Sequence, residues 1–419
     1  MLTAVVGINW GDEGKGRMVD LLSQEYKIVA RYQGGNNAGH TVVNDKGKFI
    51  LNLLPSGILR DDTVNVMGPG MVIDLEHLAG EVGRLRDAGV SITPDHLKIS
   101  DRAVICMPYH KLLDCLEEDR LADKKFGSTR RGISPVYSDK YMKKALRMGD
   151  LKDPAALRER LEGIIEWKNL TVVKGYGAEP VTLDGMMEWL EKYGMPFADY
   201  VCDTTKLLSD AEDVLFEAQL GALRDIDFGI YPYTSASSTI AAYAPVGAGV
   251  PGRRLDRVVG IMKAYSTCVG EGPFTCELFG EEGEALRAAG NEYGAATGRP
   301  RRVGGFDAVA SRYGVMMQGA SEIAVTKLDV LSYLDRIPVC EAYEVDGEIV
   351  RDFMVGPRLD RAKPVYTYFD GWKTDISGCR RFEELPVNAQ KYVRYLEQAV
   401  NCRISYVSVG AAREEYIKM

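Results

Sequence analysis

A glycine-rich stretch close to the N-terminus has residue types that could act on a phosphorylated substrate. It reads G-I-N-W-G-D-E-G-K-G-R over residues 7–17 and directly follows an apolar run at residues 2–6. Its four glycines allow backbone N–H groups to turn inward around an anion. A helix that starts near Arg17 would direct its positive dipole toward the same anion. The pattern predicts a strand, a loop that holds polyphosphate, and a helix.

One carboxylate in this loop needs a chemical reason for its position. The spacing is not that of a Walker A loop, because Asn9 replaces a glycine and Lys15 precedes Gly16 instead of a magnesium-binding Ser or Thr. Asp12 would repel phosphate unless it bound a cation or accepted a proton. We therefore interpret Asp12 as a reacting group. The alternative is an ordinary surface turn of Gly, Asp and Lys.

A second glycine loop follows a second predicted strand. The run K-I-V-A-R at residues 27–31 leads into Y-Q-G-G-N-N-A-G-H-T at residues 32–41. Loops at the carboxyl ends of parallel strands share one edge of the sheet, so we expect both glycine loops to face one pocket. His40 lies in this loop, where little core is available for packing. It is either a catalyst or a structural side chain.

Two basic stretches and one hydroxyl-rich stretch could bind further anions. K-K-F-G-S-T-R-R-G-I at residues 124–133 and G-A-A-T-G-R-P-R-R at residues 294–302 interrupt an acidic sequence and suit phosphate or carboxylate. Y-P-Y-T-S-A-S-S-T at residues 231–239 suits phosphate or sugar. Each stretch has an alternative interpretation, because charge runs are usually solvated surface and hydroxyl residues also make turns.

The tetrapeptide T-K-L-D at residues 326–329 follows an apolar run and is close to the N-K-x-D motif of guanine-nucleotide proteins. Asp329 could accept hydrogen bonds from N1–H and the exocyclic amine of guanine, and the stem of Lys327 would lie along the base. Residues 408–410 (S-V-G) could close the other side of the base. Together with a phosphate loop, this tetrapeptide predicts a guanine nucleotide.

Composition limits the class of protein. The chain has 419 residues, of which 46% are hydrophobic and 27% charged, and 52 basic against 60 acidic residues give a net charge of -8. These values predict a globular protein without general affinity for nucleic acid or membrane surfaces. No run approaches the ~18 apolar residues of a membrane span. We expect a cytoplasmic protein whose eight cysteines are reduced.

The elements that must position these residues alternate between strands and helices. A helix is expected at residues 75–88, and strands are expected at residues 2–6, 27–31, 99–107, 214–221 and 323–329, the last ending in the T-K-L-D turn. Strands that end in glycine loops predict an α/β fold, similar to P-loop NTPases, with a central, largely parallel sheet flanked by helices and elaborated by loops and insertions. No internal repeat is evident, and we expect residues 1–419 to form a single domain.

The order of the motifs resembles the adenylosuccinate synthetase family over nearly the whole chain. G-x-N-W-G-D-E-G-K-G and Y-Q-G-G-N-N-A-G-H-T are highly specific, and G-S-T-R-R-G-I, Y-P-Y, A-T-G-R-P-R-R and T-K-L-D follow in order. The resemblance implies GTP-dependent ligation of L-aspartate to IMP, giving adenylosuccinate, GDP and phosphate through 6-phosphoryl-IMP. This is the first committed step from IMP to AMP. The resemblance also implies a Mg²⁺ cofactor and a homodimer.

Roles for individual residues follow from the same resemblance. Asp12 would remove the N1 proton of IMP, His40 would donate to the charge that develops during phosphoryl transfer, and Lys15 would neutralise phosphate oxygens. Asp12 and the carbonyl of Gly39 would hold Mg²⁺. The implied GTP site comprises Gly11, Asp12, Glu13, Gly14, Lys15, Gly16, Arg17, Gly39, His40, Thr41, Arg301, Lys327, Leu328, Asp329, Ser408, Val409 and Gly410. The implied IMP site comprises Asp12, Glu13, Gly14, Lys15, Asn37, Ala38, Gly39, His40, Thr129, Lys143, Leu220, Ser235 and Arg299. The implied aspartate site comprises Ala295, Ala296, Thr297, Gly298, Arg299, Pro300 and Arg301.

Four positions depart from the family pattern. Lys143 stands where an arginine usually reaches the IMP phosphate across a dimer interface, which keeps the charge but loses the bidentate fork. Ser235 replaces a threonine, and Pro300 interrupts an arginine run. The family's E-G-A-Q-G is here E-A-Q-L-G, so Leu220 replaces a glutamine that contacts hypoxanthine unless Gln219 has shifted into that role.

Two alternative functions remain open at this point. One is a paralogue that aminates a different purine monophosphate with aspartate. The other is a guanine-nucleotide-binding protein without ligase chemistry. Asp12 and His40 argue against the second alternative, because a binding module gains nothing from a carboxylate among phosphates.

Overall fold

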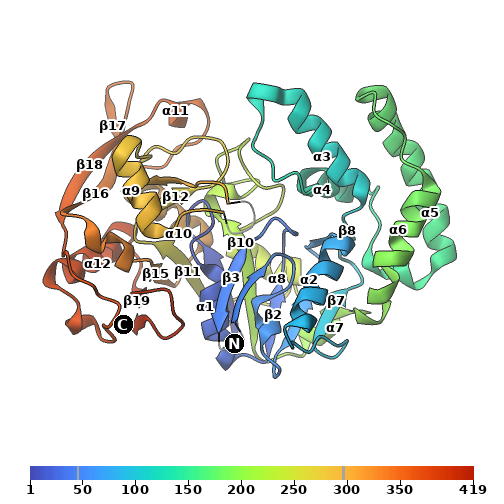
Figure 1. Cartoon of the computed structure of the whole chain (residues 1–419), viewed down its shortest axis with the longest axis horizontal. Coiled ribbons are helices and arrows are strands. Elements are labelled where there is room, and N and C mark those ends of the chain that lie inside the picture. The colour runs from blue at the N-terminus through green and yellow to red at the C-terminus, as the bar shows by residue number, and fades with distance from the viewer. Residues whose placement is uncertain (45–46, 295–297) are drawn as a thin grey trace.

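The structure is a computed structural model that describes residues 1–44, 47–294 and 298–419. A ten-stranded sheet runs through the centre of the molecule (Figure 1), with the strand order β20-β19-β15-β11-β1-β10-β2-β5-β7-β9. Neighbouring strands are parallel except at the edge, where β19 and β20 are antiparallel. The strands of this sheet are β1 Leu2–Gly7, β2 Ile28–Arg31, β5 Val64–Met67, β7 Leu97–Ser100, β9 Val201–Cys202, β10 Val214–Gly221, β11 Arg257–Lys263, β15 Glu322–Thr326, β19 Ile404–Ser408 and β20 Tyr416–Lys418. The predicted α/β fold with a largely parallel central sheet is confirmed.

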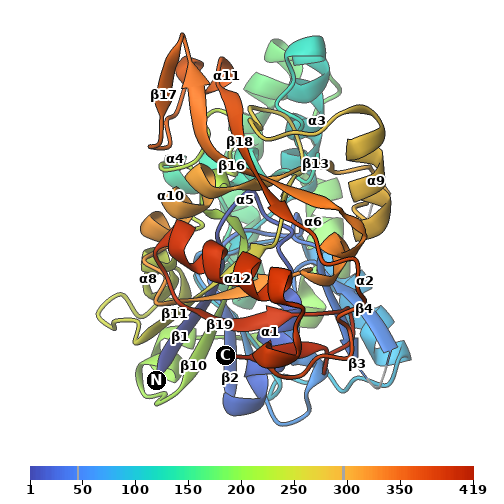
Figure 2. The same cartoon turned by 90° about the vertical axis from the view of Figure 1, so that its left-hand side faces the viewer.

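Helices cover both faces of this sheet. The helices are α1 Lys15–Leu22, α2 Leu75–Asp87, α3 Pro108–Leu121, α4 Ile133–Met142, α5 Pro154–Asn169, α6 Leu183–Tyr193, α7 Thr204–Ser209, α8 Ala244–Ala248, α9 Gly280–Gly290, α10 Ala308–Gln318, α11 Pro357–Asp360 and α12 Val387–Val400. Side chains alternate along β1, so Val5 packs against Met18 of α1 whereas Val6 packs in the cluster that contains Ala248 of α8. Helix α12 packs against β15 and β19, and Figure 2 shows α12 beside β19. Burial of both faces explains why the central strands are continuous apolar runs.

Two additions flank the central sheet. Helices α3, α4, α5 and α6 lie on one side of the molecule in Figure 1, and the strands β16, β17 and β18 lie on the other. The shorter sheets pair β3 His40–Asn44 with β4 Gly47–Leu51, β6 Val72–Ile73 with β8 Val104–Ile105, β12 Ser266–Cys268 with β13 Arg302–Gly304, and β16 Arg336–Val345 with β14 Phe306–Asp307, β17 Glu348–Val350 and β18 Lys363–Asp370.

Most predicted elements are confirmed, with one clear error. Helix α2 matches the prediction for residues 75–88, and the Asp74 side chain caps it by accepting a hydrogen bond from the backbone N–H of His77 at 3.2 Å. The single strand predicted at residues 99–107 is wrong. The chain turns after Ser100, where the N–H of Ala103 donates to its carbonyl at 3.1 Å, so β7 and β8 belong to different sheets.

Five of the loops that carry the predicted chemistry leave the same edge of the central sheet, whereas the described residues of the 124–133 and 294–302 stretches lie outside this sheet. The five loops follow the carboxyl ends of β1, β2, β10, β15 and β19, which run parallel to one another. Parallel strands place such loops side by side. Among the described residues, no helix combines the length and the apolar character that a membrane crossing needs.

Candidate active site

A buried glutamate, Glu13, holds the loop between β1 and α1 through hydrogen bonds to its backbone. The Glu13 carboxylate accepts hydrogen bonds from the backbone N–H of Asn9 at 3.1 Å and of Gly11 at 2.8 Å, and it contacts Nζ of Lys15 at 2.7 Å. Both Glu13 and Lys15 are buried. Gly14 has φ of 97°, in the left-handed region, where the loop turns into α1. The predicted strand, anion loop and helix are therefore present, with the helix starting at Lys15.

Asp12 faces outward from this loop and not into the core. Its side chain is 30% exposed, and its Oδ2 lies 2.9 Å from Nε of Arg301. Nη1 of Arg301 also donates to the buried carboxylate of Glu292 at 2.6 Å. The structure thus brings together Asp12 and Arg301, two predicted site residues that lie far apart in the sequence.

His40 opens β3 and forms a pair with a fully buried carboxylate. Its Nδ1 lies 2.5 Å from Oε1 of Glu217 in β10, and Glu217 also accepts hydrogen bonds from the backbone N–H and the hydroxyl of Ser56 at 2.7 and 2.6 Å. Burial lowers the pKa of His40, although the charge of Glu217 opposes this effect. Burial would raise the pKa of Glu217, but His40 and Arg31 outweigh it and the pKa is lowered. The imidazole is held at Nδ1, which leaves Nε2 for a ligand.

The His40–Glu217 pair lies against the phosphate loop. A Cβ on Gly16, in the first turn of α1, would lie 2.8 Å from the Cβ of His40. A Cβ on Gly7 would lie 2.3 Å from the carbonyl oxygen of Leu220 in β10. Glycine at both positions lets the two predicted glycine loops and the end of β10 approach one another. The expectation that both loops face one pocket is therefore consistent with this close approach.

Leu220 and Gln219 point to different partners. Leu220 has φ of 61° and lies beside Gly11, where an added Cβ would be 3.3 Å from the Cα of Leu220. Gln219 is fully buried, donates from Nε2 to Oδ1 of Asn37 at 2.7 Å, and accepts a hydrogen bond from Arg31. The leucine, not the glutamine, is the side chain next to the phosphate loop.

The T-K-L-D turn contains a buried oxygen that lacks a partner. Asp329 opens a short 3₁₀ helix, Asp329–Tyr333, directly after β15. Within the described part of the chain its Oδ1 is buried and has no hydrogen-bond partner, and burial raises the pKa of the carboxyl group. The backbone N–H of Leu328 donates to the carbonyl of Ser408 at 3.3 Å, so the predicted base-binding segments meet. A buried acceptor without a donor is unfavourable unless a ligand supplies the donor.

A buried charge cluster connects the two halves of the site. Glu292 is fully buried and contacts Nζ of Lys263 at 2.9 Å and of Lys327 at 3.1 Å, in addition to Arg301. Its pKa is lowered because these cations outweigh burial, whereas burial lowers the pKa of Lys263 to about 8. Tyr265 donates its hydroxyl to the same carboxylate at 2.5 Å. Glu292 therefore links the arginine beside Asp12 to the lysine of the T-K-L-D turn.

The remaining predicted residues are more dispersed. Thr129 is exposed in the loop before α4, Ser235 donates its backbone N–H to the carbonyl of Arg224 at 2.8 Å, and Arg299 is exposed. Lys143 is exposed at the end of α4, where its backbone N–H donates to the carbonyl of Lys140 at 3.2 Å. Three predicted aspartate-site residues, Ala295, Ala296 and Thr297, lie outside the described residues.

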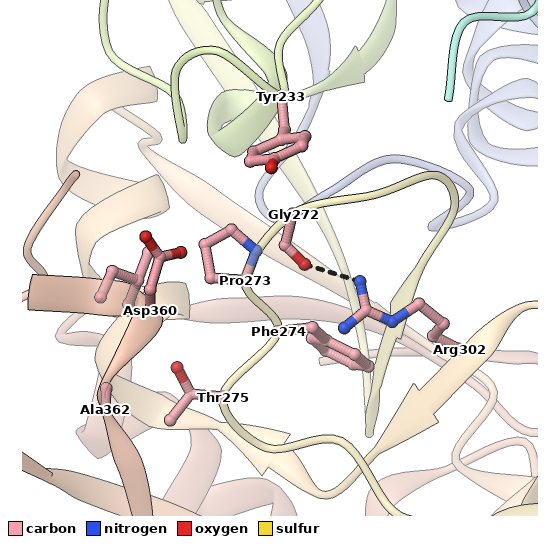
Figure 3. A pocket seen from close by; sticks show the side chains of 9 residues that line it. Tyr233, Gly272, Pro273, Phe274, Thr275, Arg302, Asp360 and Ala362 are labelled. Carbon is pink, nitrogen blue, oxygen red and sulfur yellow. Dashed lines mark hydrogen bonds between the residues drawn. The ribbon is translucent and has the colours of Figure 1, made fainter. Parts of the chain in front are cut away.

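A polar hollow of about 380 Å³ lies beside the predicted Y-P-Y segment (Figure 3). Tyr233, Gly272, Phe274 and Arg302 are among the residues that line it, and Arg302 donates to the carbonyl of Gly272 at 2.7 Å. Arg302 also pairs with the carboxylate of Glu277. Asp12, Lys15, His40 and Asp329 do not line this hollow, and its one arginine already has partners. The hollow is therefore not the candidate active site.

The donor set suits a magnesium ion that a phosphorylated ligand completes. Among the described residues, no group of three or more His, Cys, Asp or Glu side chains could hold a metal. The outward carboxylate of Asp12 and the carbonyl of Gly39, a residue on which an added Cβ would meet no other atom within 4 Å, offer oxygen ligands. Magnesium typically takes one or two protein oxygens together with phosphates and waters. These residues fit that mode of binding.

Sequence reasoning missed three charged residues of this site. Glu217, Arg31 and Glu292 are buried and hold His40, Gln219 and Arg301, respectively. The available signal was a charged residue within or at the end of an apolar strand run, as in V-L-F-E-A-Q and K-I-V-A-R. A charge in a buried strand requires a partner.

Comparisons with known proteins show which family this chain resembles. The adenylosuccinate synthetase family model matches residues 4–417. The adenylosuccinate synthetase of Streptococcus sanguinis (strain SK36) is 44% identical over 416 residues, 98% of this chain and 96% of the relative. That of Exiguobacterium sp. (strain ATCC BAA-1283 / AT1b) is 44% identical over 418 residues, 99% of this chain and 97% of the relative.

Solved structures are similar over the same length. The fully ligated adenylosuccinate synthetase of Plasmodium falciparum superposes with a TM-score of 0.93 at 34% identity and covers 100% of this chain and 99% of its own. The succinoaminodeoxyadenylate synthetase of cyanophage S-2L, bound to dGMP and dATP, has a TM-score of 0.62 at 18% identity, covers 99% of this chain and 94% of its own, and shares the fold. The family match and the identities to the bacterial relatives extend over nearly the whole chain, and the chain belongs to the adenylosuccinate synthetase family.

Proposed function

We propose that this protein ligates L-aspartate to IMP and uses GTP, giving adenylosuccinate, GDP and phosphate. The observation that carries this proposal is the position of Asp12, an outward carboxylate in the phosphate loop. The His40–Glu217 pair lies close to this loop, against Gly16 in the first turn of α1. A nucleotide-binding module has no use for a carboxylate among phosphates. A ligase of this kind uses such a carboxylate as the base that removes a proton from the purine.

Asp12 takes the N1 proton of IMP in the first step. The electron pair left on the purine makes O6 the nucleophile, which attacks the γ-phosphorus of GTP, and GDP leaves. The amine of aspartate then attacks C6 of 6-phosphoryl-IMP and displaces phosphate, with loss of a proton from the amine. In the structure Arg301 contacts one oxygen of this carboxylate, Oδ2.

His40 and Lys15 stabilise the charge that develops during phosphoryl transfer. Nδ1 of His40 donates to Glu217, so Nε2 carries a proton for donation only when the imidazole is positively charged. The carboxylate of Glu217 and the phosphates of GTP both favour this charged form. Lys15 has three donors and can keep its contact with Glu13 while it binds phosphate oxygens. Asp12 and the Gly39 carbonyl would hold Mg²⁺, which neutralises phosphate charge when bound.

GTP is the expected phosphoryl donor because of Asp329. Its buried Oδ1 has no partner among the described residues, and the N1–H and amine of guanine would supply donors that adenine lacks at those positions. Asp329→Asn would turn one acceptor into a donor and relax discrimination against other purine triphosphates.

We further propose that the protein is a homodimer. Tyr141 and Met142 at the end of α4 are 76% and 48% exposed, and Val246 of α8 is 47% exposed. We name these three residues the α4–α8 patch. Tyr141 and Met142 directly precede Lys143, and the end of α4 lies near α8, which contains Val246. Large apolar side chains that gather at a surface are typical of protein interfaces. A second copy docked on this patch would receive Lys143 at its IMP phosphate.

The compartment and the domain organisation are part of the same proposal. All eight cysteines carry free thiols, and this is typical of a reducing compartment. We place the reaction in the cytoplasm on this ground. We also propose that residues 1–419 work as one domain, because the loops of the site come from strands at both ends of the sequence.

The test is a product assay. Purified protein with Mg²⁺, GTP and aspartate is offered IMP, GMP, dGMP and XMP in turn, and mass spectrometry identifies the succino-nucleotide. Product from IMP, absent with Asp12→Asn, supports the proposal, whereas product only from another monophosphate would favour the paralogue. Leu220→Gln is included because Leu220 lies beside the phosphate loop. We expect this variant to lower the KM for IMP and sharpen selectivity.

A further inference from the structure

One arginine of α1 holds the loop between β19 and β20. Nη1 of Arg17 donates to Oγ of Ser408 at 2.7 Å and to the carbonyl of Gly410 at 2.5 Å. Its Nη2 donates to the carbonyl of Glu415 at 3.1 Å and to that of Ala412. A single guanidinium thus binds four acceptors spread over residues 408–415. All four acceptors are neutral, so the arginine is needed for the number and geometry of its donors and not for pairing with a carboxylate.

This loop lies between the base-binding turn and the phosphate loop. The carbonyl of Ser408 accepts the backbone N–H of Leu328, next to Asp329. Arg17 belongs to the first turn of α1, two residues after Lys15 in the phosphate loop. One short helix segment therefore contacts both the phosphate side and the base side of the candidate GTP site.

A second arginine ties the far end of the same loop to α1. Nε of Arg413 lies 3.2 Å from Oδ2 of Asp20. Inside the loop, the backbone N–H of Ala412 donates to the side chain of Glu415 at 2.6 Å. Arg413 contributes one ion pair at the edge, whereas Arg17 reaches acceptors at both ends of the loop.

We propose that Arg17 is a positioning residue that fixes the 408–415 loop to the phosphate helix, so that the base and the phosphates of GTP are bound as one rigid unit. This inference rests on the proposed function, in which Ser408 and Asp329 face guanine. A planar guanidinium has five donors in a fixed fork, whereas a lysine ammonium is a point donor on a flexible stem. Lysine at position 17 could not hold all four acceptors at once.

The test compares Arg17→Lys and Arg17→Met with the unmodified protein. We expect the KM for GTP to rise roughly tenfold in Arg17→Met and less in Arg17→Lys, because several hydrogen bonds that order the loop are lost. The kcat and the KM for IMP should stay within about threefold, since neither phosphoryl transfer nor the IMP loops involve these contacts. Amide hydrogen exchange of residues 404–419, measured without nucleotide, should become faster.

A matched control is Arg158→Met, which removes an arginine of α5 that pairs with exposed Asp184. It should change neither the KM for GTP nor exchange in residues 404–419. A fall in kcat with an unchanged KM for GTP in Arg17→Met would overturn the proposal, and so would unchanged exchange of this segment. If the unmodified protein formed no product from IMP, the proposed function would fail, while the exchange measurement would still test the attachment of the loop to α1.

Discussion

Two carboxylates near the phosphate loop have opposite environments and, in our proposal, opposite tasks. Asp12 is 30% exposed on a loop, where a substrate can reach it. Glu217 is fully buried, and its oxygens are used by His40 and Ser56. A carboxylate that accepts several hydrogen bonds keeps its charge, whereas one that faces a ligand can exchange a proton. The different environments therefore suit Asp12 to act as a base and Glu217 to orient His40.

Replacing Asp12 by asparagine tests the base directly. Asp12→Asn keeps the size of the side chain but cannot accept the N1 proton, so we expect kcat to fall by at least ~10²-fold. GTP binding, measured by calorimetry, should remain within an order of magnitude because Lys15 and the loop backbone are unchanged. Near-normal turnover would exclude Asp12 as the base.

Glu217 should set the pH range in which His40 works. His40 donates from Nε2 only as the imidazolium, so activity should fall as pH rises through its pKa in the complex. Glu217→Gln removes the negative charge that opposes the effect of burial, and the pKa of His40 should drop further. The basic limb of the kcat profile then moves to lower pH. At a fixed pH above the limb, the kcat of Glu217→Gln should be lower than that of the unmodified protein by roughly tenfold for every pH unit by which the limb has moved.

The control for this variant is Ser56→Ala, which removes one donor to Glu217 but leaves the charge in place. Its kcat profile should keep the position of the basic limb. A profile that is identical in Glu217→Gln and the unmodified protein would show that Glu217 has no influence on the protonation of His40.

At the residue scale, sequence reasoning found groups on loops more readily than groups in strands. Asp12 and His40 stood out because glycine loops leave polar side chains little core to pack against. Glu217 did not, because its partner His40 lies 177 positions away and the pairing appears only after β10 and β3 are placed. Glu292 was also missed because its partners are distant in the sequence: its cations come from β11, the turn after β15 and the 294–302 stretch.

At the scale of elements, the predicted strands were correct where both faces are buried. β1 is buried along all six residues and β10 at seven of eight, so their sequences are apolar runs apart from Thr3, Glu217 and Gln219. β18 is exposed or half-buried throughout, and its sequence carries no such signal. β7 and β8 were merged because the charged pair Asp101 and Arg102 was interpreted as an interruption within one strand, whereas these residues form the turn between two strands.

Helix α10 begins at a buried aspartate whose protonation should affect stability. Oδ1 of Asp307 accepts the backbone N–H of Ala310 at 2.9 Å, and Oδ2 accepts the hydroxyl of Tyr343 at 2.8 Å. Burial nevertheless raises the pKa of this carboxyl group to about 6 from an ordinary value of 3.8. The folded state therefore keeps a proton that the unfolded chain releases between about pH 4 and 6.

Because the folded state binds this proton more tightly, Asp307 makes the protein less stable as the pH rises. The contribution of Asp307 is full below about pH 4, declines as pH rises toward 6, and is level above that, with a total change of about 3 kcal/mol. Asp307→Asn keeps a cap for α10 but does not titrate, so its stability relative to the unmodified protein should rise between pH 4.5 and 7. Urea unfolding at both pH values measures this gap. A constant gap would mean that the folded and unfolded pKa values are equal.

At the scale of the whole molecule, one expected site residue, Lys143, is exposed at the end of α4. Lys143 follows the exposed Tyr141 and Met142 at the end of α4. Nζ of Lys140 donates to the carbonyl of Pro69 at 3.2 Å, and an added Cβ on Gly249, which caps α8, would lie 3.3 Å from Pro69. The end of α4 therefore lies near α8, and in our proposal the α4–α8 patch receives a second copy.

A mixing experiment distinguishes a lysine that acts across the dimer from one that acts within its own chain. Asp12→Asn and Lys143→Ala are each expected to be weakly active at low IMP, the first through lost base catalysis and the second through lost phosphate contact. In a mixed dimer, the Lys143→Ala subunit keeps its own Asp12 and receives Lys143 from its partner, so one of the two sites is complete. The other site lacks both residues.

Equal amounts of the two variants, unfolded and refolded together so that subunits exchange, should form homodimers and mixed dimers in the statistical ratio 1:2:1. Half of the dimers then have one complete site, and the mixture should recover about a quarter of the unmodified activity. If Lys143 acted within its own chain, no dimer would contain a complete site and the mixture would be no more active than the average of the two variants. Light scattering must show a dimer in each sample, because a monomer that is fully active would remove the interface from the mechanism.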